Sequence, residues 1–120
     1  MSRRHVLYLK DMVAACAKVR EFSQGLTFES FASYGMAYYS LVRLLEIIGE
    51  AAKNVPDSVR VRHPEVEWQR IGRTRDIMAH HYFALENETL WEIIQDHVPQ
   101  LEAQLGPIVE DESNKVLDGE

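Results

Sequence analysis

Apolar residues recur along the first half of the chain with the spacing of helix faces. Over residues 4–22 they follow the i, i+3, i+4, i+7 pattern of one face, and Gly25 is a suitable stop signal. Thr27 is a candidate N-cap for a short helical turn at residues 28–31. A second long stretch covers residues 35–54, and its apolar face is wide enough to contact neighbours on two sides. Two long helices are therefore predicted before residue 55.

The second half of the chain is also predicted to be helical, after a break at residues 55–57, which contain Pro56. A short turn up to residue 64 precedes a third long helix that begins near Trp68. A further helix is predicted from residue 87 or 89, where residues 89–92 have the form of a capping box. It should continue to about residue 105 with a kink at Pro99.

These patterns predict an all-α protein, an up-and-down helical bundle with four to five main helices. No strand pattern, internal repeat or phosphate-binding glycine loop competes with that interpretation. Residues 1–110 are expected to form one domain, and the acidic residues 111–120 are expected to form a frayed tail.

Composition narrows the class of protein. The longest apolar run, residues 12–17, is far shorter than the roughly 20 residues that cross a bilayer, so we expect a soluble, cytoplasmic protein without a membrane segment. The single cysteine, Cys16, excludes an internal disulfide and lies on an apolar helix face, which predicts a buried structural thiol rather than a nucleophile. Without a second cysteine or a His-x3-His pair, neither a metal nor a cofactor is predicted.

The charge is unevenly distributed. The formal net charge is -6, which argues against a protein that coats nucleic acid. Residues 60–75 nevertheless carry a net charge of +3 from five arginines, whereas residues 86–120 carry -9. Any nucleic acid bound to this protein would therefore follow the arginines and avoid the acidic C-terminal third.

Reactive side chains concentrate in residues 73–82, where arginines accompany His80, His81 and Tyr82. An imidazole can move a proton to or from a ribose oxygen, and a guanidinium can stabilise the charged phosphorus centre, so these groups suffice for RNA cleavage without metal. The alternative is an ordinary helix end with solvated arginines and histidines that cap carbonyls. On a straight helix, positions 75 and 80 lie about 140° apart. A shared site thus requires a loosened helix, an exposed helix end or a second subunit, and we expect a dimer interface.

The motif also carries a resemblance. The spacing Arg75-x4-His80-x-Tyr82, the stretch LEIIGEAA at residues 45–52 and the surrounding tryptophans resemble the HepT-like toxins, a branch of the HEPN superfamily of helical ribonucleases. The resemblance implies a homodimeric, metal-independent endoribonuclease toxin that acts on RNA. It also implies a partner, a nucleotidyltransferase antitoxin of the MntA type. Arg75 and His80 take the catalytic positions, and Tyr82 takes the position that the antitoxin modifies with AMP.

Three residues depart from the family pattern and are candidate auxiliary residues. Asp76 stands where asparagine is frequent, His81 replaces a small glycine, and Arg73 occupies a position that is usually small. A carboxylate at position 76 could bind Arg75 and oppose a phosphate. His81 leaves open which of two imidazoles works.

Two alternative functions remain beside the ribonuclease. One is a non-catalytic helical partner that binds and assists a nucleotidyltransferase, with Arg75 and His80 only binding phosphate. The other is a plain dimerising module. The charged stripe of the second long helix is either a solvated ladder of ion pairs or part of a site; it consists of Arg43, Glu46, Glu50 and Lys53. The isolated histidines are expected at the surface or at element boundaries; they are His5, His63 and His97.

Overall fold

Helices make up nearly all of the structure that the computed structural model describes, which covers residues 3–80 and 85–118. In chain order they are α1 (Arg4–Ser23), α2 (Phe28–Phe31), α3 (Met36–Asn54), α4 (Asp57–Arg62), α5 (Trp68–His80), α6 (Asn87–Glu92), the π-helix η1 (Ile93–His97) and α7 (Val98–Asp118). No strand occurs within these ranges. The predicted all-α class is confirmed, and the long helices begin and end close to the predicted residues.

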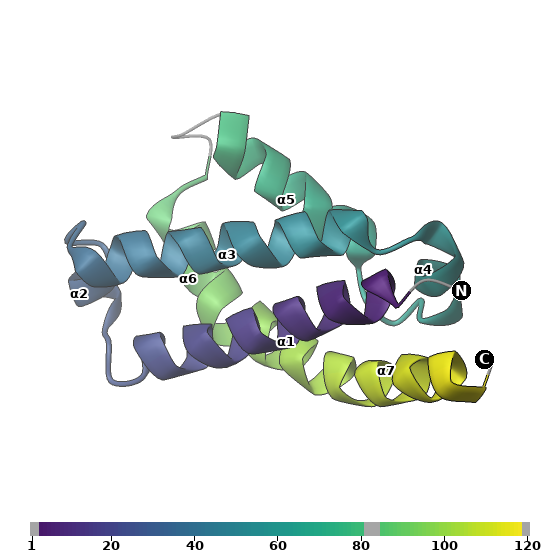
Figure 1. Cartoon of the computed structure of the whole chain (residues 1–120). Helices are drawn as coiled ribbons and strands as arrows, with labels where there is room; N and C mark the ends of the chain where they lie inside the picture. The colour runs from purple at the N-terminus through teal and green to yellow at the C-terminus, as the bar shows by residue number, and fades with distance from the viewer. Residues whose placement is uncertain (1–2, 81–84, 119–120) are drawn as a thin grey trace.

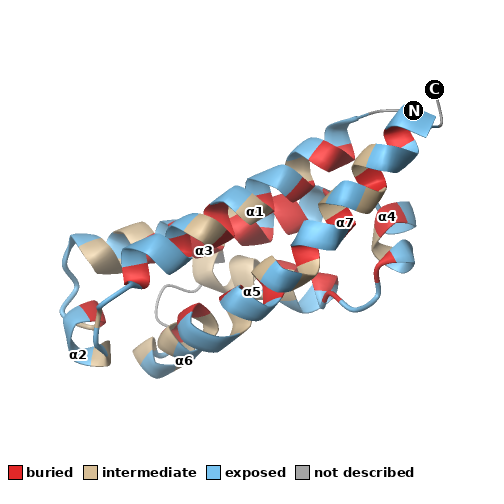
Figure 2. Ribbon diagram, turned by 90° about the horizontal axis from the view of Figure 1, so that it is seen from below, coloured by how far each residue is buried: buried red, intermediate tan, exposed pale blue. Residues whose placement is uncertain are grey.

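Helix α1 lies between α3 and α7, and α5 packs against α3 (Figure 1). The buried residues line the facing sides of these helices (Figure 2). The core includes Leu9, Met12, Val19, Leu41, Leu45, Ile48, Leu101, Leu105 and Ile108. Both sides of the wide apolar face of α3 are therefore covered within one chain, by α1 and by α5. None of the described helices is long and apolar enough to cross a membrane.

Local signals fix the ends of the helices in the first half. The Thr27 side chain accepts a hydrogen bond from the Ser30 backbone N–H, and Ser30 reciprocates at the Thr27 backbone, so α2 begins with a capping box. After α3, the side chain of Arg60 donates to the carbonyl oxygens of Val55 and Ala52 at 3.0 and 2.8 Å. This arginine satisfies carbonyls that the end of a helix leaves without intrahelical partners.

The second half departs from the sequence prediction in detail. Helix α6 begins at Asn87, and its N-cap residue, Glu86, makes no side-chain capping bond, so the capping box predicted at residues 89–92 is wrong. Pro99 has no N–H to donate to the carbonyl of Gln95. The helix widens into η1 directly before this proline and then continues as α7. The expected kink is thus a π-helical segment.

The acidic C-terminal segment is helical rather than frayed, which corrects the expectation for residues 111–120 as far as the structure describes them. Helix α7 continues to Asp118, and both Glu112 and Val116 are buried. The charge pattern was misleading because a carboxylate in this segment is paired across 50 residues of sequence with Arg62. The start of α1 and the end of α7 lie at the same end of the molecule (Figure 1).

Glu112 is the centre of a buried ionic network that joins three parts of the chain. Its side chain is 0% exposed, and Arg62 donates to its two oxygens at 3.0 and 2.6 Å. His63 Nε2 lies 2.6 Å from one oxygen, and His5 Nε2 lies 3.3 Å from the other. Burial raises the pKa of Glu112, but the hydrogen bonds from Arg62 and His63 prevail and hold this pKa at about 2. His5 lies at the start of α1 and His63 is the C-cap of α4, so the predicted boundary positions are confirmed, whereas the predicted surface positions are wrong because both side chains are buried.

The single cysteine is a structural residue, as predicted. Cys16 is fully buried on the core face of α1. Burial, together with the negative charge of Glu102, raises the pKa of its thiol to about 12. The thiolate needed for nucleophilic chemistry is therefore strongly disfavoured in the folded protein.

Candidate active site

Helix α5 carries the reactive motif and remains regular to its end at His80. Positions 75 and 80 therefore lie about 140° apart around its axis, and the loosening considered from the sequence is absent from residues 68–80. For His80, the structure describes only the backbone. His81 and Tyr82 lie outside the described residues. Arg75 is thus the member of the motif whose surroundings are defined.

Helix α3 contacts α5 at Arg75, where the side chain of this arginine begins. A Cβ atom placed on Gly49 would overlap the Cβ of Arg75 and would lie 3.3 Å from the carbonyl oxygen of Ile71. Glycine is therefore required at position 49 for this close approach of the two helices. The stem of Arg75 is held in place by the packing of α3, which leaves its guanidinium at the edge of the helix pair.

Two carboxylates hold the guanidinium of Arg75, which is 25% exposed. Its Nη2 lies 3.4 Å from Oε2 of Glu50 on α3, and its Nη1 lies 3.5 Å from Oδ1 of Asp76 on its own helix. Among the residues that the structure describes, no acceptor binds its buried Nε. The arginine is oriented by long contacts at its tip, which leaves donors available to a ligand.

Asp76 is bound more closely by a lysine than by Arg75. Lys53 Nζ donates to Oδ1 of Asp76 at 2.6 Å, from α3 to α5. The pKa of Asp76 is lowered, first by the Lys53 hydrogen bond and then by Arg75. Asp76 therefore pairs with Arg75, as considered from the sequence, and also with a second cation, Lys53.

The charged stripe of α3 divides into two parts. Arg43 pairs with Glu46 along the helix at 3.5 Å, as a solvated ladder does. Glu50 and Lys53 instead face α5 and line the candidate site. The sequence left both interpretations open: the ion-pair ladder is confirmed for Arg43 and Glu46, whereas a functional role for Glu50 and Lys53 stays a prediction. The signal that identifies Glu50 and Lys53 is that they flank Gly49 and Ala52, where α3 is buried.

The expected arginine path along residues 60–75 is largely committed to internal contacts. Arg60 caps α3 and Arg62 binds the buried Glu112. Arg70 pairs with Glu67 at 3.0 Å on the surface of α5. Arg73 is exposed, and Arg75 lies in the candidate site. The cations of this region that remain exposed or partly exposed to a phosphate are therefore Arg70, Arg73, Arg75 and Lys53, rather than the whole basic segment.

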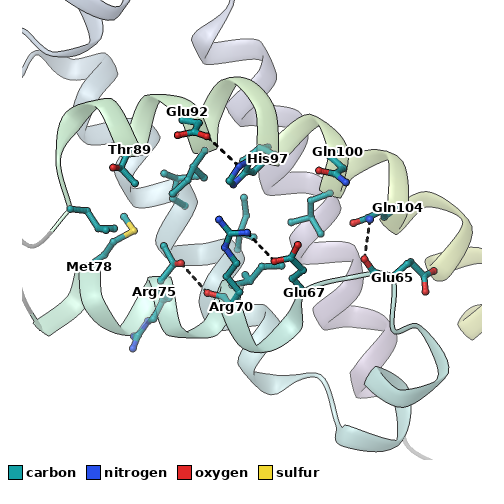
Figure 3. A pocket seen from close by; sticks show the side chains of 18 residues that line it. Glu65, Glu67, Arg70, Arg75, Met78, Thr89, Glu92, His97, Gln100 and Gln104 are labelled. Carbon is teal, nitrogen blue, oxygen red and sulfur yellow. Dashed lines mark hydrogen bonds and ion pairs between the residues drawn. The ribbon is translucent and has the colours of Figure 1, made fainter.

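A cavity of about 260 Å³ lies between α5 and the α6, η1 and α7 segment. Apolar side chains such as Ile71, Met78 and Ile93 form part of its lining. Figure 3 shows Arg70 reaching toward this cavity, whereas the charged end of Arg75 points away from it. Arg75 is itself among the residues that line the cavity, so the cavity adjoins the Arg75 site although the guanidinium points the other way.

One group of metal-ligand residues exists within the described ranges, although none was predicted. His63, Asp111 and Glu112 place one ligand atom each within 4.8 Å of one another. Arg62 binds Glu112, and Lys115 binds Asp111 at 2.8 Å. Both carboxylates are already paired with cations, so the group is organised as an ion-pair network.

The helical bundle and the spacing of Arg75 and His80 agree with the resemblance to helical ribonucleases. Comparison with known proteins agrees. The family model described as ribonuclease HepT-like matches residues 12–108. The chain belongs to the HepT-like ribonuclease family.

Named relatives cover most of the chain. A protein of Thermococcus cleftensis named "Probable ribonuclease HepT" is 36% identical over 104 residues, which are 87% of this chain and 94% of the relative. A candidate RNase of Caldanaerobacter subterraneus subsp. tengcongensis is 37% identical over 105 residues, which are 88% and 94% of the two chains. A candidate RNase of Methanocaldococcus jannaschii is 32% identical over 104 residues, which are 87% and 86%. No solved structure matches the chain.

Proposed function

We propose that this protein is a metal-independent endoribonuclease toxin in which Arg75 and His80 are the catalytic residues. The observation that carries the proposal is the setting of Arg75. Gly49 and Glu50 fix it, partly exposed, five residues before the histidine that ends α5. Membership of a ribonuclease family and the names of its relatives support RNA as the substrate.

The proposed reaction needs no group beyond these side chains, RNA and water. Removal of the 2′-OH proton lets this oxygen attack the adjacent phosphorus, and the 5′-oxygen leaves with a proton, so that a cyclic phosphate and a free 5′-OH result. His80 transfers the proton in one of these two steps, because imidazole titrates near neutral pH, and solvent water accepts or supplies the proton in the other. Arg75 stabilises the additional negative charge at phosphorus through its guanidinium donors.

The test is cleavage of a labelled RNA by the purified protein with and without EDTA. We expect cleavage in both conditions, and a loss on the order of 100-fold or more for Arg75→Ala and for His80→Ala, which matches the size of such electrostatic and proton-transfer effects. His81→Ala is the matched control, with the adjacent imidazole removed. If His81→Ala abolishes cleavage and His80→Ala does not, His81 is the working residue. Loss of wild-type cleavage in EDTA contradicts metal independence.

The second part of the proposal is control by a nucleotidyltransferase antitoxin of the MntA type. The antitoxin transfers AMP from ATP to the phenol oxygen of Tyr82, with release of pyrophosphate. Tyr82 is two residues from His80, so the added bulk and negative charge would lie where an RNA phosphate must bind. Intact mass measurement after incubation with the antitoxin, ATP and Mg²⁺ should show one adenylyl group, and Tyr82→Phe should prevent it. Modification mapped to Tyr34, Tyr38 or Tyr39 contradicts the assignment.

The third part is a homodimer formed along the exposed side of α3. Although the apolar face of α3 is buried within the chain, Met36 and Tyr39 at its start are 86% and 62% exposed. Tyr39 and Glu50 lie within about 20° of each other around the helix axis. A contact along this side therefore brings the Arg75 sites of two subunits close to the interface.

The same experiments distinguish the ribonuclease toxin from the alternative, a non-catalytic partner of the nucleotidyltransferase. Such a partner binds RNA or nucleotide through Arg75 without cleaving it. Adenylylation with no cleavage by any unmodified preparation would favour this alternative. Cleavage that disappears on adenylylation supports the toxin.

A further inference from the structure

The surface beside Arg75 contains two cations from different helices that meet on one oxygen. Lys53 Nζ lies 2.6 Å from Oδ1 of Asp76, and Arg75 Nη1 lies 3.5 Å from the same atom. A single anionic oxygen at this position therefore reaches both cations. The oxygen that occupies it in the free protein belongs to Asp76.

The course of Lys53 is fixed by the other helix. A Cβ atom on Gly72 of α5 would lie 2.9 Å from Cγ of Lys53, so the lysine stem crosses α5 at its glycine. Its ammonium group is thereby held beside Arg75 instead of extending from α3 into solvent. The side chains of Lys53 and Asp76 are nevertheless 43% and 44% exposed, so an anion from solvent can reach them.

Exchange of the carboxylate for a phosphate is energetically accessible. Exposed ion pairs contribute little to stability, because water screens them. A phosphate offers several oxygens and takes stronger, charge-assisted hydrogen bonds from a guanidinium. Glu50 remains bound to Arg75 at 3.4 Å, so the arginine stays oriented when Asp76 leaves.

We propose that Lys53 binds an RNA phosphate together with Arg75, and that Asp76 occupies both cations until RNA displaces it. This inference rests on the ribonuclease function proposed above and adds a substrate-binding residue and an internal competitor to that site. It also explains how an acidic protein assembles a phosphate site after Arg60 and Arg62 are committed elsewhere. The two required cations come from α3 and α5 and meet only in the folded chain.

The experiment measures RNA binding and cleavage separately. Binding is measured with a 2′-O-methyl RNA oligonucleotide, which lacks the attacking hydroxyl, and cleavage with the unmodified RNA. The variants are Lys53→Gln, Asp76→Asn and the double variant. The controls are Lys18→Gln, an exposed lysine on α1, and Glu67→Gln, which removes a paired carboxylate at the residue directly before α5.

We expect Lys53→Gln to weaken binding by roughly tenfold, the effect of one lost charge-assisted hydrogen bond. The slope of log Kd against log salt should fall by about 0.7, as for one phosphate contact on a single strand. Asp76→Asn should tighten binding several-fold, and both effects should appear in KM during cleavage. In the wild-type background, loss of Lys53 lets Asp76 pair with Arg75 alone, which adds to the loss of RNA binding. Lys53→Gln should therefore weaken binding less in the Asp76→Asn background, where this carboxylate is absent. Both control variants should bind within about twofold of wild type, the range of an unused surface charge.

Each result has a defined meaning. If wild type cleaves RNA and Arg75→Ala does not, but Lys53→Gln binds as wild type, Lys53 is only a surface ion-pair partner and the inference is wrong. Weaker binding by Asp76→Asn contradicts the competitor role. If no preparation cleaves RNA but the binding changes occur as expected, the phosphate site stands and the ribonuclease function fails.

Discussion

Gly49 shows how one residue of α3 determines the position of the proposed catalytic arginine. The absence of a side chain lets the two helices meet at the root of Arg75, and Glu50 then binds its tip. The sequence indicated a wide apolar face over residues 35–54, but the periodicity of one helix contains no information on its closest approach to another. The role of Gly49 is visible only once α5 is in place.

Gly49→Ala should therefore impair both stability and cleavage. Overpacking at a close helix contact costs about 1–3 kcal/mol, and displacement of a catalytic group by about 1 Å can lower the rate on the order of 100-fold. Urea unfolding and RNA cleavage measure the two effects. The control is Gly106→Ala in α7, where a Cβ meets nothing within 4 Å. This variant should gain about 0.5–1 kcal/mol from helix propensity and cleave normally. Equal behaviour of the two variants would contradict the positioning role of Gly49.

At the residue scale, the sequence identified Arg75 and Asp76 because their motif is local. Lys53 was left undecided, because its partner Asp76 is 23 residues away on another helix. The burial of His5, His63 and Glu112 was missed for the same reason, although the two histidines do lie at helix boundaries as expected. Each looks like a surface residue in its own segment, and each becomes buried only when α1, the end of α4 and α7 come together.

At the scale of elements, the helices themselves were predictable. Apolar periodicity, Pro56 and the Thr27 cap are local signals, and the structure places helix boundaries near them. The extension of α7 to Asp118 was not predictable, because a run of acidic residues gives no local reason for order. That part of α7 depends on the ionic network around Glu112.

The Glu112 network predicts a specific pH dependence. The pKa of Glu112 is about 2 in the folded protein, against an ordinary value of 4.5. A lowered folded-state pKa contributes stability above the ordinary pKa, and this contribution is lost as the pH falls from about 4.5 to 2. Wild type should exceed Glu112→Gln by on the order of 3 kcal/mol at pH 6, and the difference should disappear near pH 2.

Urea unfolding over this pH range measures the free energy of unfolding of both proteins. The difference between the two values removes the contribution of the other carboxylates, which both proteins share. Glu110→Gln is the control, since Glu110 is the exposed neighbour of the network two positions away. Its stability should follow wild type at every pH. A wild-type advantage over Glu112→Gln that persists at pH 2 would show that the network acts through packing rather than through charge.

At the scale of the whole molecule, the protomer is elongated, with extents of 50 × 28 × 21 Å and a Cα radius of gyration of 14.9 Å. Its exposed apolar residues on α3 predict the proposed dimer contact. Tyr39→Asp should convert a dimer into a monomer, because the charge would be buried at the interface without a partner. Val61→Asp is the matched control, since Val61 is 74% exposed on α4, away from this side of α3.

Small-angle scattering and sedimentation should show a particle of twice the protomer mass for wild type and for Val61→Asp. The radius of gyration of Tyr39→Asp should approach that of a single protomer, 14.9 Å. A wild-type protein that sediments as a monomer at micromolar concentration would contradict the dimer. A dimer that survives Tyr39→Asp would place the contact elsewhere.

The start of α1 and the end of α7 lie at the same end of the molecule, so the bundle does not depend on the order in which the chain connects its helices. A short linker between the end of α7 and the start of α1 would close the chain into a ring (Figure 1). New ends could then be opened at the exposed turn around Gly25, whose φ of 80° already marks a sharp reversal between α1 and α2. Such a circular permutant would keep α3 and α5 continuous, and with them the connection from Gly49 to Arg75.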